Sequence, residues 1–498
     1  MAAYQNIQDL IHPDLVDIER FLTQGYGYAV YGSKDDNVGQ PCAPWQEMAH
    51  DWSVIYDLLG GTRGMRLAAE RRLPRFDKET DQEYIQRKET SFLIDVLDDT
   101  LDDMVSKPFS KAISFIGKVP SWVEEFNKNV DGLGTTIDEC AKNVFLDAMK
   151  WGKSHAVVDA VDMPESLPEQ PLVGDFAGAH ARVRMVPGPN LLSWKFADGR
   201  QLAAARIFSR SFSEEVVEFV HEWSPIGVSE WSRPWGEFPW KRGPTKPHGA
   251  DVVPLATMYT KRSGELTAKP PFMDLAWVSV DHWQSYSDQR QILHIARVPL
   301  LFAKLLGTPK KGAAVAGARR LIRAEDEKAD LRYVEPGGSA MLEGREHLKM
   351  LMESAKEKGA KPLRALSPMT ATGEVRQESK ASCDLQAWVE ALERFLLNVY
   401  RLAARVVPGQ ELPEDFKPQV FKEFDLRDRS GVDLAGLRLD RQRGDISREA
   451  YIAEAVRRGL LPQDFDEEAD KALLDKEAAE GMDAMEQEAS ILGKTAPE

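Results

Sequence analysis

The chain has few cysteines, and none is placed for a disulfide or metal framework. Only three occur in 498 residues, Cys42, Cys140 and Cys383, and no two form a CxxC pair. This usage is typical of a reducing compartment and argues against structural zinc. No stretch approaches about 18 uninterrupted apolar residues, so no membrane span is expected. The first residues show neither a basic region nor an apolar one after it, so secretion is not expected.

Net positive charge is missing as well. Lys and Arg number 64 and Asp and Glu 80, which gives a formal net charge of −16. Such a chain does not attract phosphate backbones or anionic membranes overall, although a local basic patch is compatible with it. The length and the 43% hydrophobic content are sufficient for a large core. They predict about two to four domains.

Catalytic signatures are a third absence. The chain contains no HExxH, GxSxG or GxGxxG motif and no Cys–His signature. His282 and His294 are twelve residues apart on one predicted helix, too far to share a metal. His155 falls in a predicted strand, where we interpret it as a packed core residue. We therefore expect no catalytic residue, no metal site and no cofactor.

Gly152-Lys153-Ser154 has the ending of a phosphate-binding loop, and its surroundings argue against that function. The motif needs an earlier glycine where this chain has Asp147, a strand before it and a helix after it. Instead, residues 137–151 carry an apolar stripe of helical spacing, and Thr136 and Glu139 have the spacing of a capping box. Gly152 then fits the left-handed end of a helix, and the following HAVVDAV fits a buried strand.

An aspartate-rich segment offers paired carboxylates of the kind that hold Mg²⁺ in nucleases. These residues are Asp95, Asp98, Asp99, Asp102 and Asp103. The apolar residues of the same segment recur on one helical face, and they are Leu93, Val96, Leu97, Leu101 and Met104. The aspartates therefore belong to the opposite face, which we interpret as solvated.

The first half of the chain has an α+β pattern. Residues 1 to about 130 carry helical periodicity, including one run that begins at Thr80, where Glu83 completes a capping box. From about 155 to 262, short β-rich runs alternate with Pro and Gly. Residues 230–249 are interpreted as a loop dense in tryptophan and proline. Its Trp231, Trp235 and Trp240 either form a binding surface or, as we prefer, cover a sheet edge.

Long helices and two insertions follow. Pro270 and Pro271 open a helix that runs to Val298, and some 27 residues give a rod of roughly 40 Å. A basic, Gly/Ala-rich excursion ends in the strand-like LRYVE. The remaining elements are a helix from Ala340 to Gly359, a turn-rich basic segment and a helix from Asp384 to Val407. Ser447 caps a further short amphipathic helix. From Asp464 onward, twelve acids against three bases predict a solvated tail.

Five segments, taken in this order, carry a resemblance to a known family. They are LPRFDKETDQEYIQRKE, GLGTTIDECAKNVFLDAMKWGKSHAVVD, KPPFMDLAWVSVDHWQSYSDQRQILHIARVPLLFAK, LRYVEPGGSAMLEGREHLKMLMESAKEKGA and ISREAYIAEAVRRGLLPQDFD. Together they span most of the chain, and none is a catalytic signature. They resemble the portal proteins of tailed bacteriophages, a family of phage structural proteins.

The resemblance implies an α+β chain with a mainly helical portal fold. Its parts would be an α/β wing (1–270), a stem helix (271–298), a small β-containing clip (299–335), a second stem helix (336–359), a tunnel loop (360–382), a helix returning to the wing (383–430), and a helical crown with an acidic tail (431–498). Such a protein is not an enzyme. It forms a homo-oligomeric ring, most often a dodecamer, at one capsid vertex of the virion, after assembly in the host cytoplasm.

Double-stranded DNA would pass through the channel of this ring during packaging and ejection. The other implied partners are the terminase, the major capsid protein and the head–tail adaptor, with no membrane. Candidate residues for contacting DNA or ring neighbours are Lys310, Lys311, Arg319, Arg320 and Arg323 in the clip and Lys361 and Arg364 in the tunnel loop. Trp277 and Trp283 of the first stem helix are candidates for packing between subunits. Sparse positive charge in an acidic ring would guide a duplex without holding it.

A function of another class stays open from the residues alone. The chain could be a Mg²⁺-dependent nucleic-acid-processing enzyme that uses Asp98 and Asp102. Mg²⁺-dependent DNA cleavage that vanishes in Asp98→Asn would favour it. A head–tail adaptor is a third possibility, which the length of the chain disfavours because adaptors are usually much smaller.

Overall fold

The computed structural model describes most of one unit and short pieces of another. The described residues are 12, 14–18, 38–161, 179–212, 215–235, 239–296, 300–304, 330–334, 338–363, 383–422 and short helical pieces between 438 and 476. The chain divides into two compact units, Met1–Phe424 and Asp425–Glu498. In the second unit Arg448 donates to Asp470 at 2.6 Å. Most of the predicted crown and acidic tail lies outside the described residues.

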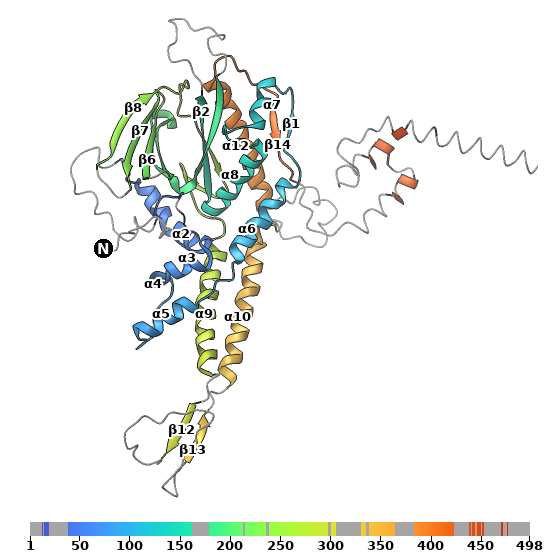
Figure 1. The fold of residues 1–498 in the computed structure, drawn as a ribbon. Coiled ribbons are helices and arrows are strands. Elements are labelled where there is room, and N and C mark those ends of the chain that lie inside the picture. The colour runs from blue at the N-terminus through green and yellow to red at the C-terminus, as the bar shows by residue number, and fades with distance from the viewer. Residues whose placement is uncertain are drawn as a thin grey trace, which may run out of the picture. The chain divides into compact units, whose positions relative to one another are not determined.

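Two antiparallel sheets form the body of the first unit (Figure 1). The smaller has the order β3-β2-β9, from His180–Pro187, Lys153–Val161 and Leu255–Tyr259. The larger is a meander in the order β4-β5-β6-β7-β8, from Leu191–Phe196, Leu202–Phe212, Val216–Trp223, Val228–Pro234 and Lys241–Lys246. Short ladders join β1 (Ser114–Ile116) to β14 (Lys417–Gln419) and β10 (Arg262–Gly264) to β11 (Thr267–Ala268). Sheets combined with many helices confirm the α+β class.

Two helices pack on the smaller sheet. They are α8 (Ile137–Trp151) and α12 (Asp384–Val406), which contact β2, β3 and β9. Within α12, Tyr400 donates to Asn127 Oδ1 at 2.6 Å and meets Phe416 edge to face at 5.1 Å between ring centroids. Aromatic burial of this kind stabilises a fold by about 1.5–3 kcal/mol for each side chain. The apolar face of α12 therefore anchors this late segment of the chain on the smaller sheet.

A second set of helices precedes the sheets in the chain. It comprises α2 (Ala43–Leu59), α3 (Gly61–Leu67), α4 (Ala69–Arg72), α5 (Asp81–Thr90) and α6 (Val96–Ser106), while α7 (Ser121–Lys128) packs on α8. Two buried indoles of α2 tie this set to the body. Trp45 Nε1 donates to Pro189 O at 2.7 Å, and Trp52 Nε1 donates to Trp151 O at 2.9 Å. Each bond satisfies a polar atom that burial would otherwise leave unpaired.

The helix boundaries follow the predicted capping signals. Thr80 with Glu83 and Thr136 with Glu139 both form complete capping boxes at the starts of α5 and α8. α8 ends at Trp151 and is capped by Gly152, whose φ of 84° lies in the left-handed region, and β2 begins at the next residue. The predicted helix stop followed by a strand is therefore confirmed.

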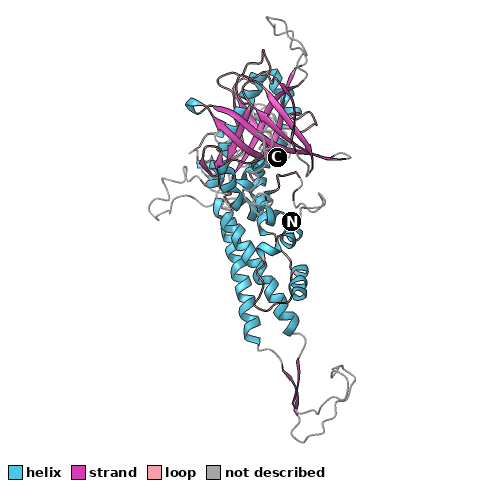
Figure 2. Cartoon of the chain, turned by 90° about the vertical axis from the view of Figure 1, so that its left-hand side faces the viewer, coloured by secondary structure: helices cyan, strands magenta, loops and turns pink. Residues whose placement is uncertain are grey.

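Two long helices leave the body together. α9 (Met273–Ala296) and α10 (Gly338–Gly359) contact each other, and the antiparallel ladder of β12 (Leu300–Lys304) with β13 (Asp330–Val334) lies between them in the chain. With 24 residues at about 1.5 Å each, α9 is about 36 Å long. Figure 2 shows the strands of the body at one end and these helices running away from it. The predicted order of long helix, β-containing excursion and helix is confirmed.

Two local predictions are wrong. Residues 230–249 are not a loop, because β7 and β8 pair there across the short connection 235–240. The helical run from Thr80 is not continuous, because α5 ends at Thr90 and residues 91–95 form no helix before α6. Ser91 Oγ bonds to Lys88 O at 2.7 Å, and Leu93 N donates to Thr62 Oγ1 at 3.1 Å. These bonds replace the helical ladder at the break.

Candidate functional site

The α9–α10 hairpin is the feature on which the predicted function depends, and its two helices differ in burial. The first half of α9 is buried on a wide arc by α2, α6 and α10, while most of the described side chains of α10 are exposed. The helices are joined where Gln289 Nε2 donates to Met341 O at 3.0 Å. A Cβ at Gly344 would overlap the Gln289 side-chain amide carbon at 2.8 Å, so glycine permits this close approach.

The two tryptophans predicted to pack between subunits have different environments. Trp277 is 52% exposed, and the Arg72 guanidinium lies 5.8 Å from its ring centroid. Trp283 is 0% exposed and belongs to the hydrophobic core of its own subunit. Packing of Trp283 against a neighbour is therefore a wrong prediction, because its indole is already enclosed. Trp277 remains available for such a contact.

A buried ion pair of α5 and the residue before its cap lies at the contact between α5 and α9. Arg87 and Glu79 are each 2% exposed at the side chain, and Arg87 Nε lies 2.8 Å from Glu79 Oε1. Arg87 also donates to Pro74 O at 2.7 Å and approaches Asp288 of α9 at 3.4 Å. The hydrogen bond from Arg87 lowers the pKa of Glu79 below its usual value. α5 is thus held at a fixed distance from α9 by a satisfied charge cluster.

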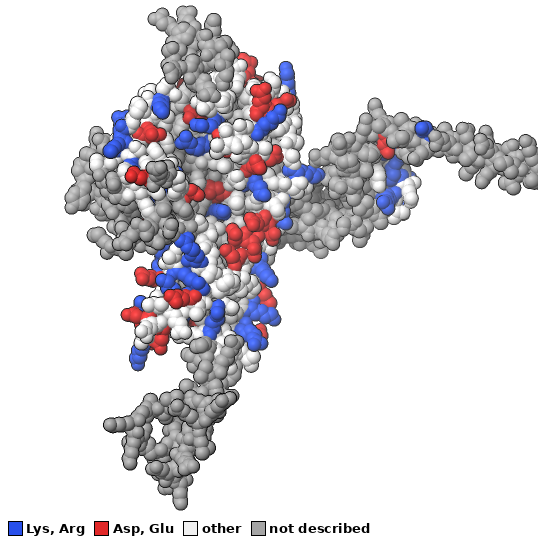
Figure 3. All heavy atoms as spheres, viewed as in Figure 1, with Lys and Arg blue, Asp and Glu red and all other residues white. Residues whose placement is uncertain are grey.

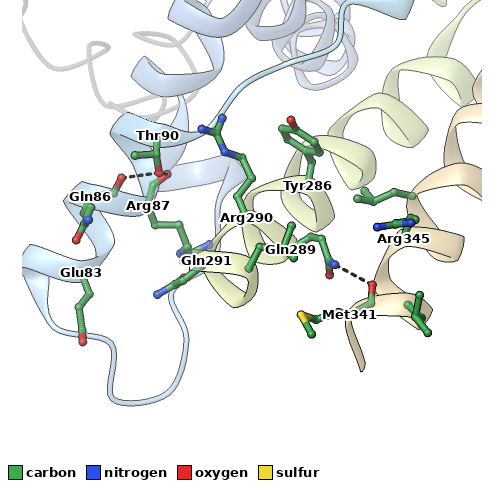
Figure 4. Close-up of a pocket in the computed structure, with 13 residues that line it drawn as sticks. Glu83, Gln86, Arg87, Thr90, Tyr286, Gln289, Arg290, Gln291, Met341 and Arg345 are labelled. Carbon is green, nitrogen blue, oxygen red and sulfur yellow. Dashed lines mark hydrogen bonds between the residues drawn. The ribbon is translucent and has the colours of Figure 1, made fainter. Parts of the chain in front are cut away.

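This docking leaves a groove between α5, α9 and α10 (Figure 4). Its volume is about 1040 Å³. The lining comes from all three helices and is Glu83, Gln86, Arg87, Thr90, Tyr286, Gln289, Arg290, Gln291, Leu293, Met341, Leu342, Arg345 and Leu348. Arginines, amides and aliphatic side chains therefore share one recess, a composition common to protein-docking surfaces.

The groove was not predicted from the sequence, although a signal for it was present. Arg290 continues the apolar stripe of α9 that includes Trp283 and Ser287. A charge at a stripe position indicates that the covering helices have ended there. In the structure α2 and α6 cover the upper part of α9, whereas Arg290 is exposed.

Only one of the predicted basic candidates has a described position. Lys361 begins the short 3₁₀ helix Lys361–Leu363, and its Nζ lies 3.6 Å from Asp274 Oδ2. Both side chains are exposed, so the pair contributes little to stability. The other candidates, Lys310, Lys311, Arg319, Arg320, Arg323 and Arg364, lie outside the described residues.

The aspartate-rich segment is α6 with its N-cap. Leu97, Leu101 and Met104 are buried, and acidic side chains gather over α6 on the face seen in Figure 3. Asp95 Oδ1 accepts from Asp98 N at 3.1 Å, which is a capping role. Within the part of the chain that the structure describes, no three His, Cys, Asp or Glu side chains are grouped to hold a metal ion.

Lys153 of the Gly-Lys-Ser stretch is enclosed in the core of the body. Its Nζ donates to Leu266 O at 2.7 Å and lies 4.6 Å from the centroid of the Trp194 ring. Burial lowers the pKa of Lys153 to about 7. Asp147, at the position where a phosphate loop needs glycine, accepts from Gly188 N at 3.1 Å, and burial raises its pKa to about 6. An enclosed lysine cannot reach a phosphate.

Two further sequence interpretations concern aromatic side chains of the sheets. His155 is fully buried, with Nδ1 2.9 Å from Thr257 Oγ1, and burial holds its pKa well below the usual value. Trp231 and Trp240 are buried, and Arg233 lies 4.3 Å from the Trp240 ring centroid. Trp235 is half-buried. The packed-histidine prediction is confirmed, and Trp231 and Trp240 are core residues rather than a binding surface.

Comparison with known proteins gives one family match and several structural similarities. The family model described as a domain of unknown function, DUF4055, matches residues 271–406. No curated protein matches the chain. No described helix is long and apolar enough to span a membrane.

The chain is similar to three solved chains at low sequence identity. The first, from the neck of an empty gene transfer agent particle with C6 symmetry, is 11% identical, with a TM-score of 0.40 over 69% of this chain and 84% of that one. The second, from the virion of a native gene transfer agent particle, is 11% identical, with a TM-score of 0.38 over 80% and 98%. The third, from the neck of a native particle with C12 symmetry, is 12% identical, with a TM-score of 0.35 over 78% and 96%.

Proposed function

We propose that this protein is a phage portal protein, a homo-oligomeric ring through which double-stranded DNA enters and leaves a capsid. The α9–α10 hairpin with the β12–β13 ladder carries the proposal. Two rods of 24 and 22 residues flank a small β-containing excursion; the first begins at the α+β body and the second returns to it. In a ring the two rods serve as the stem, the excursion as the clip and the body as the wing.

The extent of the family match supports treating these elements as one unit. Residues 271–406 begin two positions before α9 and end at the last residue of α12. They contain both rods, the ladder, and residues 360–382, which we assign to the tunnel loop. The body outside this span would form the outer part of the ring.

The charge of the chain suits passage of DNA rather than its retention. Each phosphate that Lys or Arg neutralises adds affinity through counterion release, so a strongly basic channel would hold the duplex. A formal net charge of −16 in each subunit opposes that. In this proposal the ring has no catalytic activity and no cofactor. A terminase supplies the energy, and the major capsid protein and a head–tail adaptor are its neighbours in the virion, with subunits passing through the host cytoplasm before assembly.

Electron microscopy of the purified full chain tests the proposal. We expect rings with a central hole in views along the axis, and a particle mass of about twelve times 55.9 kDa by native mass measurement. A chain that stays monomeric at micromolar concentration and near-physiological salt would contradict it. A matched preparation that carries Trp277→Ala keeps the subunit core intact, because Trp277 is exposed.

A further inference from the structure

The groove between α5 and α10 has no described occupant, and its walls are partly apolar. α9 forms the floor, and the walls include Leu348 and Leu342, the latter 60% exposed. Large apolar side chains left exposed beside a recess are typical of a surface that another protein covers. In the same recess Gln291 Oε1 is buried and accepts no hydrogen bond within the part of the chain described here.

The groove also carries positive charge that no described residue balances. Arg290 and Arg345 are exposed, and neither forms an ion pair among the described residues, although the Arg290 guanidinium lies 5.9 Å from the Tyr286 ring centroid. Arg87, on the wall, is neutralised by Glu79 and Asp288. Glu83 is the one acid of the lining, so the groove has an excess of cations.

The opposite side of α9 carries the complementary pattern. Asp281 precedes Arg290 by nine residues, which is about two and a half turns at 3.6 residues per turn, so the two residues lie on opposite sides of the helix. Asp274 stands one heptad before Asp281, and Ile292, 42% exposed, lies on the same side. We call this surface, made of Asp274, Asp281 and Ile292, the acidic face of α9. In the described part of the chain, Lys361 lies 3.6 Å from Asp274, and the Arg72 guanidinium lies 5.8 Å from the ring centroid of Trp277, which stands between the two aspartates in the sequence.

We propose that the groove of one subunit binds the acidic face of α9 of a second copy, an inference that rests on the proposed ring function. Arg290 and Arg345 would face Asp281 and Asp274, and Ile292 would enter beside Leu342. Two different surfaces that meet make a heterologous contact, which repeats around a closed ring. The exposed leucine and Glu83 favour a protein occupant over nucleic acid, because apolar area and a carboxylate do not attract phosphates.

Charge reversal on each surface tests the inference. The full chain is prepared as a groove variant, Arg290→Glu with Arg345→Glu, and as a face variant, Asp274→Lys with Asp281→Lys. Each variant alone brings like charges together, which raises the concentration for half-assembly by about tenfold or more in sedimentation velocity. Mixed in equal amounts, the two variants should assemble within about threefold of the unaltered chain, because both contacts in an alternating ring are then complementary.

A matched control and a milder pair complete the design. Glu346→Lys with Glu353→Lys reverses two exposed acids of α10 that do not line the groove, and assembly should be unchanged within about twofold. Arg290→Gln and Asp281→Asn remove charge without reversing it. In a double-mutant cycle their effects on assembly should be non-additive if the two side chains meet.

The outcomes separate this inference from the ring itself. If the unaltered chain forms rings and both charge-reversed variants assemble as well as it does, the ring stands and the groove contact is refuted. The groove contact is also refuted if the mixture of the two variants fails to recover assembly. It is refuted as well if the groove variant assembles normally and is defective only in DNA passage, because the groove would then face nucleic acid. A monomeric unaltered chain refutes the proposed function as well.

Discussion

Gly152 offers a direct test of how the end of α8 is built. Its φ of 84° is in the left-handed region, and a Cβ placed on it would lie 2.6 Å from the backbone carbonyl carbon of Lys269. The carbonyl oxygen of Gly152 accepts a hydrogen bond from Thr260 N at 3.0 Å, so the backbone of Gly152 is also held in place. In Gly152→Ala, changing the φ angle of residue 152 or moving the backbone of Lys269 would each cost free energy.

Two costs add in this variant. An alanine in the left-handed region costs about 1–2 kcal/mol. Forcing an extra methyl group against fixed backbone costs about 1–3 kcal/mol more. We therefore expect Gly152→Ala to lower the free energy of unfolding by about 2–5 kcal/mol. Gly134→Ala is the matched control, because Gly134 has a φ of 96° but a Cβ there meets no described atom within 4 Å.

Urea unfolding followed by tryptophan fluorescence measures both variants at equal protein concentration. Gly134→Ala should lose about 1–2 kcal/mol, the cost of the dihedral angle alone. If Gly152→Ala loses no more than Gly134→Ala, the close approach of Lys269 does not restrict this position and the reasoning fails. A selective loss of nucleotide binding in a stably folded Gly152→Ala would instead restore the phosphate-loop interpretation.

Two buried charges give further predictions. Arg87→Met should destabilise the chain by about 3–5 kcal/mol, because Glu79 is then buried without its partner, and double replacement with Glu79→Gln should recover part of this loss in urea unfolding. The pKa of Glu79 is lowered from 4.5, so the contribution of the pair is complete above pH 4.5 and is lost as the pH falls through the lower folded value; an acid midpoint that Arg87→Met leaves unmoved would contradict this. The pKa of Lys153 is lowered from 10.5 to about 7, so the unfolded state binds more protons between these values and stability rises with pH across them. Lys153→Met should remove this rise, which is no more than about 1.4 kcal/mol per pH unit for one group, and equal slopes in the two proteins would refute it.

Local signals in the sequence predicted the helix boundaries well. Capping pairs such as Thr136 with Glu139, and Gly152 at the helix end, act within a few residues and need no knowledge of the rest of the fold. The long helices α9, α10 and α12 were predicted for the same reason, because their apolar spacing extends over many turns. The aspartates of α6 were placed on the solvated face by the same spacing.

Contacts between distant segments were not predictable. Residues 230–249 were interpreted as a loop because they are dense in tryptophan and proline, yet the pairing of β7 with β6 and with β8 overrides the turn preference of the prolines. Trp277 is exposed, whereas the burial of Trp283 depends on core elements elsewhere in the chain, which local spacing does not show. The groove exists only where α5, α9 and α10 pack together. Residues 83–90 and 341–348 line it from positions far apart in the chain, so no local sequence pattern connects them.

The β1–β14 ladder makes completion of the first unit a late event during translation. Ser114 pairs with Gln419, and Phe115 stacks on Phe416 at 5.5 Å between ring centroids. A ribosome adds about 5–20 residues per second, so the second strand emerges roughly 15–60 s after the first. Both rods leave the ribosome during that interval. The last of the described strands to be made therefore determines when the unit of residues 1–424 is completely folded, while residues 425–498 are still to be synthesised.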